Sequence, residues 1–163
     1  MKKFKKLIAV VLTVILSLSV MSVVAFASTT DSLKRTDDGT WLYMENGEHN
    51  ADYTGLVKYY DTWYYVENGV LNWNYTGPTE YYGTTYYVIK SILEWDYSSL
   101  VCVNDVWHYV ENGVYSNDYT GLTKYYGTWY YVEDGVLNWD YTGLTKYYDT
   151  WYYVENGELN WNY

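Results

Sequence analysis

The side chains of this sequence best suited to recognise a ligand are aromatic, and they recur in a fixed pattern. Residues 62–73 read TWYYVENGVLNW, and near-copies begin at Thr128 and Thr150. The chain has 163 residues with 9 Trp and 25 Tyr, and all of these rings lie after residue 40. Ring faces attract cations and also stack on flat apolar surfaces. The pattern therefore favours recognition of a quaternary ammonium group or a sugar.

Acidic and histidine side chains form no catalytic or metal-binding pattern in the sequence. Equivalent exposed turns cannot each give a carboxylate the unusual environment that catalysis needs. His49 and His108 occupy different repeat positions without a third ligand, and no loop spaces its oxygen ligands as an EF-hand does. We therefore expect no enzyme, no metal and no cofactor. The recurring turn carboxylates are Glu45, Glu67, Glu111, Glu133 and Glu155.

The first 27 residues differ in composition from the rest of the chain. A basic cluster at residues 2–6 precedes an apolar run over residues 7–24, and Ala-Phe-Ala ends the segment at residue 27. This order is typical of a secretory signal peptide, so we predict a signal over 1–27 and a secreted, cell-surface or cell-wall associated protein. The alternative is an uncleaved membrane anchor, because the apolar run is longer than most signal peptides have.

The remaining residues, 28–163, are acidic and poor in aliphatic side chains. Four of the 10 basic residues lie in the signal segment, which leaves six against 20 acidic residues. Nucleic-acid binding needs basic side chains at the phosphates, so we exclude nucleic acid as a partner. Cys102 is the single cysteine, so no intrachain disulfide is available. Any core must be built mainly from rings.

A period of 22 residues organises the chain after residue 30. Five units begin at tyrosines, and a weaker unit in the same phase precedes them, with no insertion between units. A constant period indicates one supersecondary unit whose copies stack along an axis. We therefore predict one repeat domain over 28–163. Its units are 31–52, 53–74, 75–96, 97–118, 119–140 and 141–162.

Each unit is predicted to be a β-hairpin followed by a short extended stretch. In the unit 53–74, strands are expected at 56–60 and 63–66, with a second turn at 68–69 and an extended segment over 70–73. The alternation of a strand places Trp63 and Tyr65 on one face and Tyr64 and Val66 on the other. The sequence thus predicts an all-β fold, a β-hairpin solenoid without helix after the signal.

The recurring order Thr-Gly-Leu, a lysine two residues later, Trp-Tyr-Tyr and a glycine turn resembles the cell-wall-binding repeats of Gram-positive surface proteins. These repeats include choline-binding and glucan-binding types, and the resemblance covers residues 31–163. It implies a left-handed superhelix of hairpins, with aromatic ligand cages between consecutive hairpins. It also implies a non-catalytic module that attaches non-covalently to a cell-wall polymer or surface glycan.

The resemblance carries the family's ring positions onto two columns of this sequence. The Trp column holds Trp41, Trp63, Thr85, Trp107, Trp129 and Trp151, and the second-Tyr column holds Tyr43, Tyr65, Tyr87, Tyr109, Tyr131 and Tyr153. Choline-type repeats also have a Trp directly after the glycine that opens the unit. This chain has Leu56, Pro78, Leu100, Leu122 and Leu144 there. A different Trp recurs two residues before each new unit, at Trp73, Trp95, Trp139 and Trp161.

The predicted binding site lies at the junction of units 119–140 and 141–162, where every ring column is kept. Two earlier units are expected to act as spacers. Unit 75–96 has Thr85 in place of a Trp and Pro78, which removes an N–H, and unit 97–118 lacks tyrosines at Val103 and Asn104. The predicted walls of the main site are Trp129, Tyr131, Trp139, Trp151 and Tyr153. A second set is Trp63, Tyr65 and Trp73. We expect the ligand to be a cell-wall polymer or glycan. Choline is one alternative, although the Trp that forms one wall of a choline-type cage is missing.

A structural or adhesive repeat protein is the alternative function. Rings at every second position are also what the core of such a stack would need, so the same residues fit a purely structural role. The last unit ends in Trp161-Asn162-Tyr163, without the polar cap that solenoids require. We therefore expect the C-terminal repeat to bind another copy of the chain or a host protein.

Sedimentation velocity over a range of protein concentrations tests this self-association. We expect the weight-average sedimentation coefficient of residues 28–163 to rise with concentration, because exposed rings at the last unit gain from burial against a second copy. A strict monomer at high concentration would contradict self-association through the C-terminal repeat.

Overall fold

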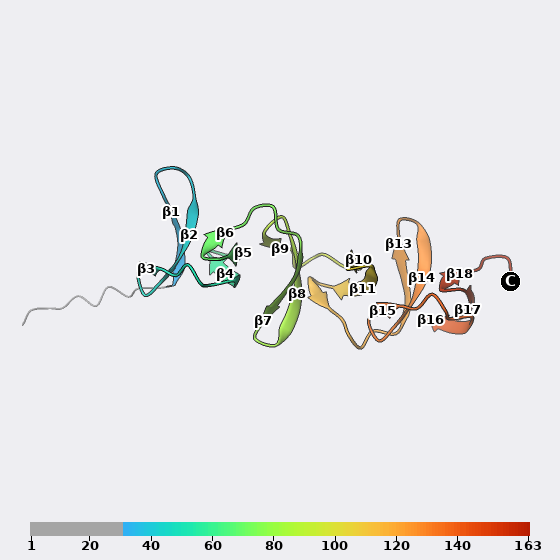
Figure 1. The fold of residues 1–163 in the computed structure, drawn as a ribbon. Helices are drawn as coiled ribbons and strands as arrows, with labels where there is room; N and C mark the ends of the chain where they lie inside the picture. Colours follow the sequence, from blue (N-terminus) through green and yellow to red (C-terminus); the bar gives the residue numbers. More distant parts are fainter. Residues whose placement is uncertain (1–30) are drawn as a thin grey trace, which may run out of the picture.

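The computed structural model describes residues 31–163, so the predicted signal peptide lies outside the described residues. All 18 regular elements in the described part are β-strands. Figure 1 shows them as successive hairpins arranged in a row, whose tips point in different directions. Over the same residues no helix is long and apolar enough to cross a membrane. The predicted all-β hairpin solenoid is confirmed.

Each unit consists of two longer antiparallel strands and a third strand of two residues. The first strands are β1 (Ser32–Arg35), β4 (Gly55–Tyr59), β7 (Gly77–Tyr81), β10 (Ser99–Val103), β13 (Gly121–Tyr125) and β16 (Gly143–Tyr147). The second strands are β2 (Trp41–Glu45), β5 (Thr62–Glu67), β8 (Thr84–Ile89), β11 (Val106–Glu111), β14 (Thr128–Glu133) and β17 (Thr150–Glu155). The third strands are β3 (Glu48–His49), β6 (Val70–Leu71), β9 (Ile92–Leu93), β12 (Val114–Tyr115), β15 (Val136–Leu137) and β18 (Glu158–Leu159).

The first hairpin differs from the others at its tip. In the second unit a two-residue turn joins β4 to β5, and Leu56 lies opposite Tyr65. In the first unit a longer loop spans Thr36 to Thr40, closed by a 2.8 Å hydrogen bond from the Thr36 N–H to the Thr40 carbonyl. As a result Leu33 lies opposite Tyr43. Strand β1 is therefore one residue out of step with the 22-residue period.

The two faces of each hairpin pack against different neighbouring units. On one face of the second hairpin, Val66 and Tyr64 belong to a cluster shared with the unit before it. On the other face, Tyr65 and Trp63 belong to a cluster shared with the unit after it. This is the predicted alternation. Each junction between units is therefore one layer of hydrophobic core, and no hairpin has a core of its own.

A backbone hydrogen bond to the carbonyl of the second turn joins each unit to the one before it, and the N–H of the same turn residue bonds within its own unit; this residue is Ser91 in unit 75–96 and glycine in the others. The Tyr43 N–H donates to the Gly69 carbonyl at 2.8 Å, and the Gly69 N–H donates to the Tyr53 carbonyl at 2.8 Å. A Cβ atom on Gly69, whose φ is +74°, would lie 2.4 Å from the Asn50 carbonyl oxygen. The backbone conformation and the close approach of the preceding unit both favour glycine here, and Ser91 is the one other residue type at this position in the described units.

Two glycine substitutions separate these two requirements. Gly135 and Gly83 both have a φ of +76°, but a Cβ on Gly135 would lie 2.2 Å from the Ser116 oxygen, whereas a Cβ on Gly83 meets nothing within 4 Å. We expect Gly135→Ala to lower the free energy of unfolding by roughly 3 kcal/mol and Gly83→Ala by about 1 kcal/mol. Thermal unfolding measures both. Equal losses would contradict the inter-unit contact as the cause.

Candidate aromatic ligand sites between the hairpins

Four aromatic side chains meet at the junction of units 97–118 and 119–140. Trp107 comes from β11 of the first unit, whereas Tyr125, Tyr130 and Trp139 come from the second unit. The Trp107 and Tyr125 rings pack edge to face with centroids 5.0 Å apart, and Tyr130 and Trp139 do so at 5.7 Å. These rings and two leucine side chains line a cavity of about 110 Å³. The arrangement is an aromatic cage open to small apolar or cationic groups.

The same four ring positions recur at three other junctions. The quartets are Trp41, Tyr59, Tyr64 and Trp73; Trp63, Tyr81, Tyr86 and Trp95; and Trp129, Tyr147, Tyr152 and Trp161. Across the four quartets the first Trp and Tyr have centroids 4.8–5.3 Å apart. The second Tyr and Trp have centroids 5.7–6.2 Å apart. We call each quartet a cage and name it by its first Trp.

The junction of units 75–96 and 97–118 has no cage. Its four equivalent positions hold Thr85, Val103, His108 and Asn117. Thr85 belongs to unit 75–96 and the other three residues to unit 97–118, yet the Trp and Tyr rings of all four positions are absent together. The tyrosine pair of the core at this junction is kept. The four cage positions therefore vary as one set, separately from the core.

A half-buried histidine replaces a cage tyrosine at this junction. The His108 ring lies 5.4 Å from the Tyr115 ring, and burial lowers the pKa of His108. Burial also raises the pKa of Tyr115 to about 12, and the Tyr115 hydroxyl is buried without a hydrogen-bond partner. In the described part of the chain, the Thr79 hydroxyl is the other buried side-chain polar group without a hydrogen-bond partner.

The lowered pKa of His108 predicts a loss of stability in mild acid. The unfolded chain takes up a proton at the ordinary histidine pKa, whereas the folded chain resists protonation until a lower pH, so stability falls as pH drops below about 6.5. We expect His108→Tyr, which restores the residue of the sister units, to reduce the fall in melting temperature between about pH 7.5 and pH 5.5. An unchanged fall would contradict this role of His108.

The second tyrosine of each Trp-Tyr-Tyr triplet belongs to the core. Tyr65 stacks on Tyr75 and Tyr131 on Tyr141, each pair with centroids 3.7 Å apart and ring planes 17° apart. Tyr65 and Tyr131 are buried. Burial raises the pKa of Tyr119, the partner ring in another such pair, to about 12. Pairs of this kind occur in all six units.

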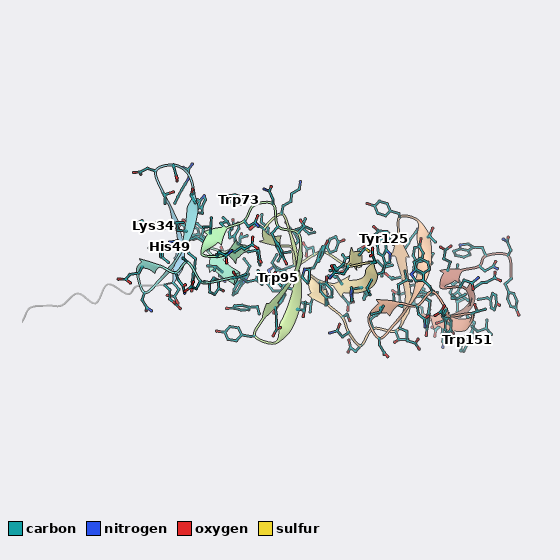
Figure 2. The ribbon with its side chains drawn as sticks, in the orientation of Figure 1. Lys34, His49, Trp73, Trp95, Tyr125 and Trp151 are labelled. Carbon is teal, nitrogen blue, oxygen red and sulfur yellow. The ribbon has the colours of Figure 1, made fainter. Side chains whose placement is uncertain are left out.

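The five residues predicted to form the main site do not meet at one junction. Trp129 and Tyr131 face the unit 141–162, in the same core cluster. Trp139 packs on Tyr130 and lines the cavity of the Trp107 cage, one junction earlier. Trp151 lies at the C-terminal end of the row (Figure 2) and is 62% exposed. Tyr153, on the same strand β17, stacks on Tyr163.

The second predicted set divides in the same way. Trp63 belongs to the cage with Tyr81, Tyr65 lies in the core of that junction, and Trp73 packs on Tyr64 in the cage before it. The prediction from sequence placed rings of the same unit in one site. In the fold, rings on opposite faces of a hairpin belong to different junctions. The prediction also missed two cage columns, namely the tyrosine before each hairpin tip and the first tyrosine of each triplet. The predicted alternation of Trp63 and Tyr64 was the signal that could have found them.

The repeated turn carboxylates have a structural role. Glu67 accepts a hydrogen bond from the Asn72 side-chain amide at 2.8 Å, and Glu133 accepts one from Asn138 at 2.6 Å. These contacts tie the second turn of a unit to the loop that follows it. Over residues 31–163, no group of three or more His, Cys, Asp or Glu side chains is placed to hold a metal ion. Carboxylates do not line the Trp107 cage.

Two substitutions distinguish core rings from cage rings by their effect on stability. Tyr131 is 6% exposed in a stacked pair, whereas Trp139 is 48% exposed. We expect Tyr131→Ala to lower the free energy of unfolding by about 3 kcal/mol or more, and Trp139→Ala by about 1 kcal/mol. Chemical denaturation measures both values. A larger loss for Trp139→Ala than for Tyr131→Ala would overturn the assignment of Tyr131 to the core.

Comparison with known families identifies the repeats. The sequence profile of the choline-binding repeat matches residues 52–72, 96–114, 118–138 and 140–160, which together make up half of the chain. The chain therefore belongs to the choline-binding repeat family. Two units have no match of their own, namely 31–52 and 75–96, and the latter carries Thr85 in place of the cage Trp. No curated protein matches the chain as a relative.

Several solved structures are similar to the chain over most of its length. Choline binding protein F from Streptococcus pneumoniae matches 80% of the chain with 22% identity and a TM-score of 0.36, and the chain spans 42% of that protein. A complex of CbpF with ipratropium gives 23% identity, the same coverages and a TM-score of 0.35. Alternansucrase in complex with isomaltotriose matches 78% with 18% identity and a TM-score of 0.41, over 10% of its own chain.

Proposed function

We propose that the chain is a non-catalytic binding module that takes quaternary ammonium groups, such as that of choline, in its aromatic cages. Through several such contacts it attaches non-covalently to a cell-wall polymer that bears these groups. The observation that carries the proposal is the cavity at the Trp107 cage. The residues that line it are Leu100, Trp107, Tyr125, Tyr130, Leu137 and Trp139.

The lining of this cavity favours a quaternary ammonium group over a sugar. A sugar hydroxyl that leaves water needs a hydrogen-bond partner, and an unpaired one costs free energy. The cavity is lined by rings and leucines, without a carboxylate, amide or basic side chain. A trimethylammonium group has no N–H to satisfy, and its charge interacts favourably with ring faces. The acidic chain adds a long-range attraction for cations.

Leucine takes the place of the Trp that choline-type repeats have after the opening glycine. Leu100 lines the cavity, so this wall is aliphatic and not absent. Trp139 adds a ring from the loop after β15 of the following unit. Each cage therefore still has four aromatic rings, although the Trp after the opening glycine is absent. Trp63, Trp73, Trp129 and Trp139 of the predicted site residues are thus proposed as cage walls, whereas Tyr65 and Tyr131 support the cages from the core.

The proposed attachment also places the protein outside the cell. Membership of the choline-binding repeat family supports a surface role, and the predicted signal at residues 1–27 would direct secretion. The adhesive alternative, in which rings bind a second copy or a host protein, is favoured only by the exposed Trp151 and Leu144 of the last unit.

Titration of the ¹⁵N-labelled protein with choline chloride tests the proposal. Of the 9 tryptophans, all except Trp151 belong to a cage, so we expect their indole N–H signals to move and the Trp151 signal to stay. Trp107→Ala should abolish the shift of Trp139 and leave the other cages unchanged.

A matched control is Trp151→Ala, which removes an exposed ring outside the four cages. It should leave every choline-dependent shift as in the wild type. Signals that do not move at all, or that move equally for Trp151 and the cage tryptophans, would contradict ligand binding in the cages.

A further inference from the structure

Four tyrosines at the hairpin tips combine high exposure with an unfavourable backbone conformation. Their φ angles are between +45° and +52°, the left-handed region that bulky residues seldom adopt. Their exposed fractions are between 82% and 93%, so burial contributes little to offset the conformation. The four residues are Tyr60, Tyr82, Tyr126 and Tyr148.

These tip tyrosines occur only where a cage tyrosine precedes them. In the unit 97–118 the same tip position holds Asn104, with a φ of +50°. Asparagine is a residue that this conformation tolerates well, and here Val103 stands in place of the cage ring. The fold thus accepts an ordinary turn residue at the tip. A tyrosine is present only beside a cage, which indicates a role in binding.

Each tip ring extends its cage outward. Tyr82 packs edge to face on Tyr81 at 4.5 Å, and Tyr81 packs on Trp63 at 4.9 Å. The same two contacts join Tyr126 to Tyr125 at 4.6 Å and Tyr125 to Trp107 at 5.0 Å. The tip ring therefore lies at the outer rim of the cage, in reach of whatever is attached to a bound head group.

A hollow continues from the Trp63 cage past its tip ring. Trp63, Tyr81 and Tyr82 line a groove of about 580 Å³, far larger than the 110 Å³ cavity of a cage. The rest of the lining is mixed, with apolar and tyrosine side chains beside polar groups that can pair with hydroxyls of a ligand. The polar and charged side chains among them are Asp31, Glu45, Thr54, Lys58 and Glu80.

We propose that the tip tyrosines form a second subsite, which stacks on a neutral sugar residue next to the quaternary ammonium group in the cage. This inference rests on the proposed function of the cages. Three carboxylates and one lysine along the groove disfavour a phosphate or an acidic sugar. A tyrosine ring offers a rigid, amphipathic surface that suits a sugar ring, and ordering it costs little entropy.

The arrangement of the tips favours a polymer over a protein partner. The tips of the β7–β8 and β13–β14 hairpins point to opposite sides of the row (Figure 1). Single rings on different sides do not form the contiguous patch that a stable protein interface needs. A flexible polymer with repeated head groups can use them one after another, and each contact raises the effective concentration for the next.

The test compares choline chloride with choline glucoside, in which the choline hydroxyl is joined to glucose. The variant Tyr60→Asn/Tyr82→Asn/Tyr126→Asn/Tyr148→Asn gives every tip the residue type that the chain uses at Asn104. We expect the wild type to bind the glucoside about fivefold more tightly than choline, by tryptophan fluorescence. The variant should bind choline as the wild type does and lose this gain. Asn104→Tyr, a tip ring without a cage, should add nothing.

Three results would overturn the inference. In the first, the fourfold variant still binds the glucoside more tightly than choline. In the second, the wild type binds both ligands equally. In the third, the variant loses choline binding together with the gain for the glucoside. The last result would make the tip ring part of the cage. Absence of choline binding in the wild type would instead refute the proposed function, and with it the sugar subsite. Circular dichroism of each variant checks that the hairpins are intact.

Discussion

The structure depends on one constraint, which is that a 22-residue hairpin cannot bury either of its faces alone. At each junction the facing sides of two hairpins cover one another, so the core clusters lie between units. Junctions are held by tyrosine pairs and by the second turn, whose carbonyl accepts a hydrogen bond from the preceding unit while its N–H bonds to the first residue of its own unit. Because the spacing of units follows from these contacts, the rings around them are held in fixed positions before any ligand arrives.

This constraint explains how one aromatic-rich sequence serves two purposes. Strand alternation sends Tyr65 inward to stack on Tyr75 and leaves Trp63 nearer the edge of the same face. The inner pairs are kept in every unit, including at the junction that lost its cage. The edge rings are kept or lost as a set of four. Most edge rings also pack against the core clusters, so folding explains part of their presence, and the proposed ligand binding explains why they are kept as a set.

Much of the fold follows from the sequence, whereas the site needed the three-dimensional arrangement. The period of 22, the turn residues and the alternation of Trp63 and Tyr64 predicted the hairpins and their two faces. They could not show that Trp139 completes a cage with Trp107, 32 residues earlier, because the packing partner of a loop residue is set by how units stack. The longer loop at the tip of the first hairpin also shifts β1 by one residue relative to the period. The sequence did not reveal this shift, because Leu33 and Lys34 are both compatible with a strand.

The central claim is that ligand binds where four edge rings meet and not on the inner tyrosine pairs. A crystal structure of residues 28–163 with choline tests this most directly. The account predicts one trimethylammonium group in each of the cages of Trp41, Trp63, Trp107 and Trp129, and none at the junction that holds Thr85 and His108. Choline bound at the Thr85 junction, or in contact with the inner pairs while the cages stay empty, would contradict it.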